Sequence, residues 1–376
     1  MIYILIFLLF SFIEIIRKNG NPSKDLSAKV FIIIMMAMTG FRYGVGTDYF
    51  TYAWYYNNNP INLIDTITYT SHMDIGYRIL MSIFKSTGIP FEIFAGIIGV
   101  IILVTFNKLV RNNSKMILLS LLMFYGSYYH IYVHSAIRQG IALIIFFLAF
   151  YRYYKKGHSL KYITCIIIGA LFHKSILITL IIPLIPLKVL KLLNNKFVVI
   201  GMIFICIVLG LIGIDGLLVK IISITGISLN YGRDSINILA ILLRIINISI
   251  ILFLFYQRRS SISDWERKQI AIYIIGMSIY FLICRIPMLS RLIEYFGILE
   301  IIIVPNLVYI SKIEFNKFCY KFAILFLMGI ILFKDLAAAV NEGSYYNKNA
   351  LTYPYTSIFN KDEIFTYRYV LPIYLK

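Results

Sequence analysis

Basic residues that could bind an anion lie beside or inside the apolar stretches of this chain. Most are arginines, and the set is Arg42, Arg78, Arg138, Lys174, Lys220, Arg233, Arg244, Arg285 and Arg291. Arginine in or next to a membrane span is energetically costly and usually serves a function, and its planar fork suits phosphate and carboxylate better than lysine does. We expect this set on the outer side, where the positive-inside rule disfavours cations, so it predicts an anion site that opens to the outer leaflet. The alternative is structural ion pairing with Asp48, Asp74, Asp215, Asp234, Glu294 and Glu300.

Residues 41–56 combine charge, glycine and aromatic rings directly after the apolar run 30–38. Arg42 and Asp48 stand near the end of that run, and the glycines between them allow a tight turn or the close approach of a ligand. The aromatic residues from 49 to 56 are typical of a membrane–water boundary or of a sugar-binding surface. The stretch is therefore either part of a site or an interfacial loop with one Arg–Asp pair.

Residues 130–142 place Arg138 and Gln139 in the first turns of an apolar helix. The amino end of a helix favours an anion, and an arginine there adds a directed contact. His130 and His134 are four residues apart, which would suit a metal ion. Because no third ligand lies nearby, we favour interfacial histidines over a metal site.

Two further stretches carry polar groups inside apolar sequence. His173 interrupts the run 160–187 and is either a structural residue or a base. Arg285, Arg291 and Glu294 lie close together in the sequence, and the last two can pair on one helical face. The sequence contains no GK[ST] phosphate loop, GxSxG, HExxH or DxD motif, so we predict neither a cofactor nor a metal.

The composition places these residues in a membrane protein. The chain has 376 residues, of which 60% are hydrophobic and 14% charged, and its mean hydropathy is +0.83. Soluble domains average about 25% charged residues. Long apolar runs recur from end to end, so we expect an all-α polytopic membrane protein. We assign the net charge of +19 to loops on the cytoplasmic side, and not to nucleic-acid binding.

About twelve apolar runs are candidate membrane spans. They are residues 1–16, 27–41, 91–108, 116–131, 137–153, 160–172, 174–187, 197–214, 238–256, 269–285, 292–311 and 319–338. The short connections rich in Lys and Arg are expected in the cytoplasm, and they are 17–29, 108–115, 152–161, 188–196, 257–268 and 312–321. All six share one side only if residues 160–187 form a hairpin that turns near His173. We expect one transmembrane domain over residues 1–340, with an outer loop at 42–90, and an extracytoplasmic tail over 341–376.

The order of these motifs resembles the EpsG-like family of bacterial polysaccharide polymerases, which are related in role to the Wzy-type O-antigen polymerases. The resemblance is carried by Phe41-Arg42, Gly46-Thr47-Asp48-Tyr49 with Tyr52, Arg138-Gln139 with Ala142, Phe172-His173-Lys174-Ser175, Ser290-Arg291 and Tyr295-Phe296. It covers most of the chain, to about residue 340. It implies a multi-helix shape similar to that of GT-C-type glycosyltransferases, with a cavity at the outer face.

The resemblance also implies a reaction at the periplasmic face of the bacterial inner membrane. A growing sugar chain leaves its undecaprenyl diphosphate carrier and is transferred to an incoming lipid-linked repeat unit. The residues expected to bind the diphosphate are Arg138, Arg42, Arg291 and Arg285. The leading candidate for the base is Asp48, beside Arg42 in the first outer loop, and the second candidate is His173. The residues expected to contact sugars are Tyr49, Tyr52, Trp54 and Gln139. The expected partners are the lipid-linked oligosaccharide, the bilayer and a chain-length regulator protein.

Two other functions fit the same composition. A flippase or transporter for lipid-linked oligosaccharide could also use outer arginines, but such proteins often show repeated halves with broken helices at matching positions. No such repeat is visible in this sequence. An O-antigen ligase is also a transferase, but it uses a different acceptor.

Overall fold

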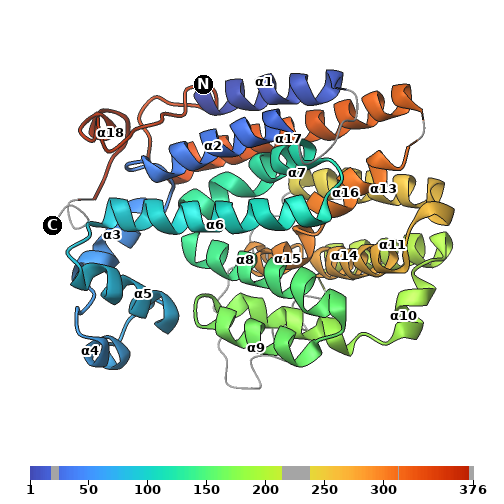
Figure 1. Ribbon diagram of the computed structural model, residues 1–376, viewed down its shortest axis with the longest axis horizontal. Coiled ribbons are helices and arrows are strands. Elements are labelled where there is room, and N and C mark those ends of the chain that lie inside the picture. The colour runs from blue at the N-terminus through green and yellow to red at the C-terminus, as the bar shows by residue number, and fades with distance from the viewer. Residues whose placement is uncertain (18–24, 214–237, 312, 372–376) are drawn as a thin grey trace.

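The computed structural model describes residues 1–17, 25–213, 238–311 and 313–371, which are helical and contain no β-strand (Figure 1). The first helices are α1 (Ile2–Ile16), α2 (Leu26–Gly40), α3 (Tyr49–Asn58), α4 (Leu63–Thr68), α5 (Ile75–Ser86), α6 (Phe91–Asn113), α7 (Ile117–Phe124), the π-helix η2 (Tyr125–Ser135) and α8 (Ile137–Arg152). There follow η3 (Tyr154–Lys156), α9 (Ser159–Ala170), η4 (Lys174–Leu184), α10 (Leu187–Leu192), α11 (Lys196–Ile212), α13 (Ile238–Gln257), η5 (Arg259–Ser261), α14 (Asp264–Leu282), α15 (Pro287–Gly297), α16 (Glu300–Tyr309), α17 (Glu314–Glu342) and α18 (Glu363–Tyr367). The predicted all-α class is confirmed for this part of the chain. The candidate charged residues Asp215, Lys220, Arg233 and Asp234 lie outside it.

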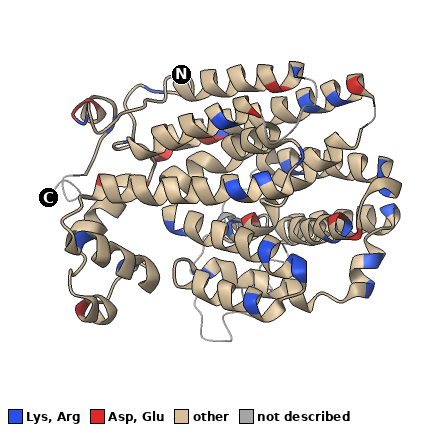
Figure 2. Ribbon diagram, viewed as in Figure 1, with Lys and Arg blue, Asp and Glu red and all other residues tan. Residues whose placement is uncertain are grey.

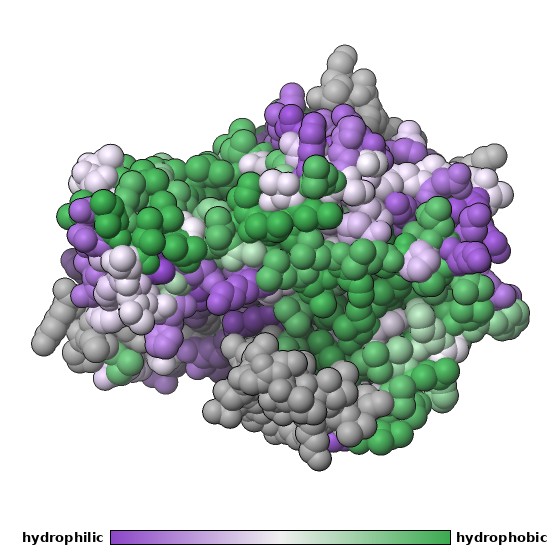
Figure 3. Space-filling view, turned by 90° about the horizontal axis from the view of Figure 1, so that it is seen from below, coloured by the Kyte–Doolittle hydropathy of each residue, from purple (hydrophilic) through white to green (hydrophobic). Residues whose placement is uncertain are grey.

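The long helices run side by side along the longest axis of the molecule (Figure 1). Helix α1 packs against α17, and α2 packs against α6, which also contacts α8. Their helical backbones satisfy their own hydrogen bonds, as a hydrocarbon environment requires. Figure 3 shows hydrophobic side chains across the middle of one face and hydrophilic ones toward its sides. This is the arrangement of a helical membrane protein.

Loops that the sequence assigns to the cytoplasm meet at one end of the bundle, which we call the basic end. It comprises the described parts of 17–29, 108–115, 152–161, 188–196, 257–268 and 312–321. Lys155 Nζ donates to Asn113 Oδ1 at 3.2 Å, and Asn306 Nδ2 donates to the Asn113 carbonyl at 2.9 Å. Lys321 Nζ donates to the Arg17 carbonyl at 2.8 Å. Figure 2 shows many Lys and Arg residues at this end, on the right of the view.

The other loops meet at the opposite end, which we call the aromatic end. It comprises loops 41–48, 59–74, 134–136, 171–173 and the tail 343–371. Thr47 N donates to Ser135 Oγ at 3.0 Å, and Gly76 N donates to the Leu171 carbonyl at 2.7 Å. The predicted hairpin is confirmed, because α9 and η4 pack together on either side of the turn at 171–173. The two predicted sets of loops are therefore separated in space, and the side of the membrane that each faces remains a prediction.

The predicted number of twelve spans is not confirmed. The helices long and apolar enough to cross a membrane, among the described residues, are Phe91–Asn113, Ile238–Gln257, Arg291–Tyr309 and Glu314–Glu342. Shorter apolar helices are Ile2–Ile16, Leu26–Gly40, Ser159–Ala170, Lys174–Leu184 and Lys196–Ile212. Several apolar runs do not form one continuous α-helix. Run 116–131 changes to π-helix at Tyr125, and η4 is a 3₁₀-helix that contains Pro183. Such irregular backbone is tolerated at membrane depth only where protein or water covers it, and most residues of η2 are buried in the protein.

The tail crosses the aromatic end and fastens the first loop. Arg368 donates to the carbonyls of Gly44, Gly46 and Thr47 at 2.9, 2.7 and 2.6 Å. A main-chain hydrogen bond joins Tyr43 N to the Thr356 carbonyl at 2.9 Å. The tail is therefore part of the packed structure at this end. Its extracytoplasmic location remains a prediction.

Gly46 should be among the least replaceable residues of that loop. Its φ of +109° disfavours any L side chain, and an added Cβ would lie 2.3 Å from the carbonyl oxygen of His134. We expect Gly46→Ala to lower the free energy of unfolding by roughly 2–4 kcal/mol, from left-handed strain plus overlap. Thermal unfolding of the purified protein in detergent measures the effect.

Gly88→Ala is the matched control. Gly88 also has a positive φ, +76°, but no atom lies within 4 Å of its added Cβ. It should therefore lose only the strain contribution, about 1–2 kcal/mol. Equal losses of stability in the two variants would contradict the close packing of Gly46 on η2.

Candidate active site

Arg138 belongs to a cluster of polar side chains at the aromatic end. It lies in the first turn of α8, and its Nη1 pairs with Asp74 Oδ2 at 2.7 Å. Asp74 immediately precedes α5, whose start is held against the α9–η4 turn by the bond from Gly76 to Leu171. The Arg138 and Asp74 side chains are 21% and 13% exposed, so the pair is accessible yet largely shielded from water.

Tyr52 closes one side of this ion pair. Arg138 Nε donates to the Tyr52 hydroxyl at 3.4 Å, and the guanidinium carbon lies 5.9 Å from the ring centroid. Tyr52 is itself buried, so this contact positions the arginine. Burial raises the pKa of the Tyr52 phenol, Arg138 opposes that rise, and Asp48 adds to it. The carboxylate of Asp48 is therefore an electrostatic neighbour of the cluster, beyond Tyr52.

His173 occupies the turn between α9 and η4. Its Nδ1 is hydrogen-bonded to Ser175 Oγ, which lies 2.8 Å from the hydroxyl of Tyr295 on α15. This chain of hydrogen bonds fixes the orientation of the imidazole ring. Within the described part of the chain, Nε2 has no hydrogen-bond partner. It is the ring nitrogen left available to a substrate.

The field at this cluster is positive. The pKa of His173 is lowered to about 4, first by removal from water and then by the charges of Arg138 and Arg291. The pKa of Asp74 is raised by burial, while Arg138 and Lys174 oppose that rise. The imidazole is therefore neutral at pH 7 and can accept a proton. An anion bound near these cations would make that acceptance easier, because it offsets their charge.

A polar cavity of about 290 Å³ extends from Arg291 into the helix bundle. The side chain of Arg291 lines this cavity, while its backbone carbonyl accepts a hydrogen bond from Gln139 Nε2 at 2.8 Å. Deeper in the wall, the guanidinium of Arg244 pairs with Glu294 and lies 4.3 Å from the ring centroid of Tyr280. The cavity thus offers cations, carboxylates and aromatic surface in a low-dielectric setting.

The structure therefore brings together five of the residues selected from the sequence. They are Tyr52, Arg138, Gln139, His173 and Arg291. They come from α3, the start of α8, the α9–η4 turn and α15. The local Arg291–Glu294 pair is not formed, because Glu294 pairs with Arg244 instead.

Arg42 does not line the cavity. Its side chain is fully buried, and Nη1 donates to the carbonyls of His134 at 2.6 Å and Val45 at 3.4 Å. It does not form the predicted pair with Asp48, whose Oδ1 accepts instead from Thr47 Oγ1 at 3.2 Å. Arg42 thus ties the first loop to the end of η2. Its burial corrects the expectation that it contacts the diphosphate.

Three other selected residues lie apart from the cluster. Tyr49 is buried among Tyr43, Phe50 and Phe91, so its ring is unavailable as a sugar platform. Trp54 packs edge-on against Tyr55. The guanidinium of Arg285 donates to the carbonyl of Leu211 in the last turn of α11, where a cation is favoured by the helix dipole.

His130 and His134 lie in the protein interior. The ring of His130 packs edge-on against Tyr3 at 4.6 Å, and His134 Nε2 lies 3.3 Å from Thr39 Oγ1. The two histidines are therefore buried packing residues. No group of three His, Cys, Asp or Glu residues in the described ranges is arranged to hold a metal ion.

Sequence reasoning missed several members of the cluster as site residues. Asp74 was selected only as a possible ion-pair partner, and Ser175 and Tyr295 only as parts of motifs. Asp74 carries one usable signal, because it is the last polar residue before the amphipathic helix α5. Its contact with Arg138 joins residues 64 positions apart, and no local pattern predicts that.

Comparison with known proteins adds one match. The model of the EpsG family matches residues 26–357, nearly the whole chain. No curated protein and no solved structure matches the chain. The expected likeness to GT-C-type enzymes therefore remains a prediction.

Proposed function

Because the chain belongs to the EpsG family, a polysaccharide polymerase-like family, we propose that it polymerises oligosaccharide repeat units carried on undecaprenyl diphosphate. In this proposal the acceptor and the donor meet at the aromatic end, which lies on the periplasmic side of the inner membrane. The observation that carries this proposal is that Arg138 and Arg291 both act on His173, and that Arg291 also lines a polar cavity.

The two arginines suit a departing diphosphate. Both act electrostatically on His173, and the proposed place of the diphosphate is between their guanidinium groups. Preorganised cations in a shielded site stabilise the negative charge that develops on a leaving group. Asp74 positions Arg138 through their ion pair. Since the arginines balance the charge, we propose that the transfer needs no metal ion.

His173 is the proposed base, and Asp48 is the second candidate. A hydroxyl oxygen of the acceptor sugar attacks the anomeric carbon of the donor chain, and its proton passes to His173 Nε2. The bond between that carbon and the diphosphate oxygen breaks, and undecaprenyl diphosphate leaves with the electron pair. One displacement with one base inverts the anomeric configuration. Ser175 and Tyr295 hold the imidazole in place during this step.

The polar cavity is the proposed place for sugars next to the reacting atoms. Glu294, Asn247 and Glu300 supply hydrogen-bond acceptors and donors, with Asn247 Nδ2 2.5 Å from Glu300 Oε2. Tyr128 and Tyr280 add aromatic side chains to the wall of the cavity. A chain-length regulator protein is the further partner that we propose.

A strain that lacks the gene tests the proposal against its rivals. We expect single repeat units to reach the outer leaflet on their lipid and to remain single, as shown by radiolabelling and gel electrophoresis. Units confined to the inner leaflet would indicate a flippase instead. Complete polymer that stays on its lipid carrier would indicate a ligase.

A further inference from the structure

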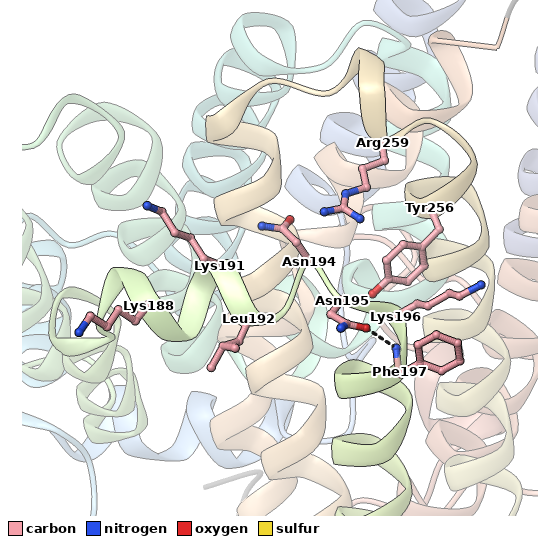
Figure 4. A pocket seen from close by; sticks show the side chains of 9 residues that line it. All are labelled: Lys188, Lys191, Leu192, Asn194, Asn195, Lys196, Phe197, Tyr256 and Arg259. Atoms are coloured by element: carbon pink, nitrogen blue, oxygen red, sulfur yellow. Dashed lines mark hydrogen bonds between the residues drawn. The ribbon is translucent and has the colours of Figure 1, made fainter.

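A wide groove of about 980 Å³ opens at the basic end, far from the cluster described above (Figure 4). Four cations line it: Lys188 and Lys191 on α10, Lys196 at the start of α11, and Arg259 in η5. Among the described residues, no carboxylate lines the groove and none forms an ion pair with these four side chains. The groove is therefore a concentration of positive charge that the described protein does not neutralise.

One polar group at the groove also lacks a hydrogen-bond partner among the described residues. The hydroxyl of Tyr256 is buried and has no hydrogen-bond partner among the described residues, and Figure 4 shows it turned toward Asn195. Asn195 caps α11 by accepting from Phe197 N at 3.0 Å, so the amino end of this 17-residue helix also opens here. A buried donor without a partner is unfavourable, and an acceptor bound in the groove would satisfy it.

An apolar stripe continues from the groove along α11. Phe197, Ile200 and Phe204 recur on one helical face, and their exposed fractions are 73%, 57% and 64%. Leu192, which is also exposed, lines the groove itself. A free phosphate would use only the cations, whereas a phospholipid would use both the cations and the stripe.

We propose that this groove binds the head group of an anionic phospholipid, with its acyl chains lying along α11. Arg259 and the Tyr256 hydroxyl are the proposed phosphate contacts, and Lys188, Lys191 and Lys196 add positive charge around the groove. Basic pockets between membrane helices on the cytoplasmic side are suited to such head groups. The proposal does not depend on the polymerase reaction.

The test is native mass spectrometry of the full-length purified protein, titrated with phosphatidylglycerol or with phosphatidylcholine of the same acyl chains. The groove variant changes Lys188, Lys191, Lys196 and Arg259 to Gln. The control variant changes the exposed Lys29, Lys108, Lys156 and Lys161 to Gln, which removes the same charge at the same end. We expect about a tenfold or greater loss of phosphatidylglycerol affinity in the groove variant only, and weak binding of phosphatidylcholine throughout.

A milder variant guards against misfolding. Tyr256→Phe keeps the ring and removes the orphan hydroxyl, and it should weaken phosphatidylglycerol binding severalfold while leaving thermal stability intact. Equal losses in the groove and control variants would overturn the proposal, because the lipid would then be held by general surface charge. Displacement of the lipid by millimolar inorganic phosphate would overturn it in favour of a free-anion site.

Discussion

Replacing Arg138 by alanine should stop chain growth and leave single lipid-linked repeat units in place of a polymer ladder. Removal of one preorganised donor to a developing charge typically slows a reaction by about a hundredfold to a thousandfold. Arg138 also pairs with Asp74, so its loss leaves a partly buried carboxylate where the diphosphate is proposed to bind. Gel electrophoresis of surface polysaccharide from complemented cells measures the chain length.

Arg152→Ala is the matched control for this experiment. Arg152 is the last residue of the same helix, at its opposite end, and its side chain is exposed. It should therefore retain a full ladder at equal protein levels. Arg138→Lys should stay defective, because an ammonium group cannot reproduce the forked contact with diphosphate. A normal ladder from Arg138→Ala would remove Arg138 from the site.

Replacing His173 by glutamine should lower the rate of transfer by about a hundredfold to ten-thousandfold, as expected when a general base is lost. Asp48→Asn should lower it far less, because Asp48 Oδ1 accepts a hydrogen bond from Thr47 Oγ1 while Asp74 is the carboxylate paired with Arg138. Single-turnover rates with purified protein and a lipid-linked repeat unit measure both effects. The reverse ranking of the two variants would make Asp48 the base.

The pH dependence of kcat/KM is a second test of His173 as the base. Its pKa is lowered to about 4, and the base is active when deprotonated, so activity is lost only as the pH falls through that value. We therefore expect nearly equal kcat/KM at pH 7.5 and pH 5.5. A base with the ordinary histidine pKa would lose roughly tenfold between these values. Such a loss would contradict the buried, positively charged setting of His173.

Hydropathy and loop charge predicted much of the fold. The apolar runs gave the all-α class, and the requirement that basic loops share a side predicted the hairpin at His173. The number of membrane spans was harder to predict. Hydropathy shows how long an apolar run is, but not whether the run forms one continuous α-helix. The π-helix from Tyr125 and the 3₁₀ segment with Pro183 interrupt runs that look continuous in sequence.

The site was predictable where one residue combined a costly side chain with a favourable local position. Arg138 at a helix start and His173 at a turn meet that condition, and they converge. Arg42 carries the same kind of signal, but its guanidinium binds the carbonyl of His134 inside the protein. Sequence cannot distinguish an arginine that binds a ligand from one that binds distant backbone. Asp74 was overlooked as a site residue for the same reason, since only folding brings it to Arg138.

Direct binding of undecaprenyl diphosphate tests the central assignment without depending on catalysis. The measurement is the dissociation constant for the purified protein in detergent, compared between Arg138→Ala and Arg152→Ala. We expect Arg138→Ala to weaken binding by about tenfold to a hundredfold, as for a lost charge-assisted contact, and Arg152→Ala to leave it unchanged. Equal affinity in the two variants would show that the arginine cluster at the aromatic end does not hold the diphosphate.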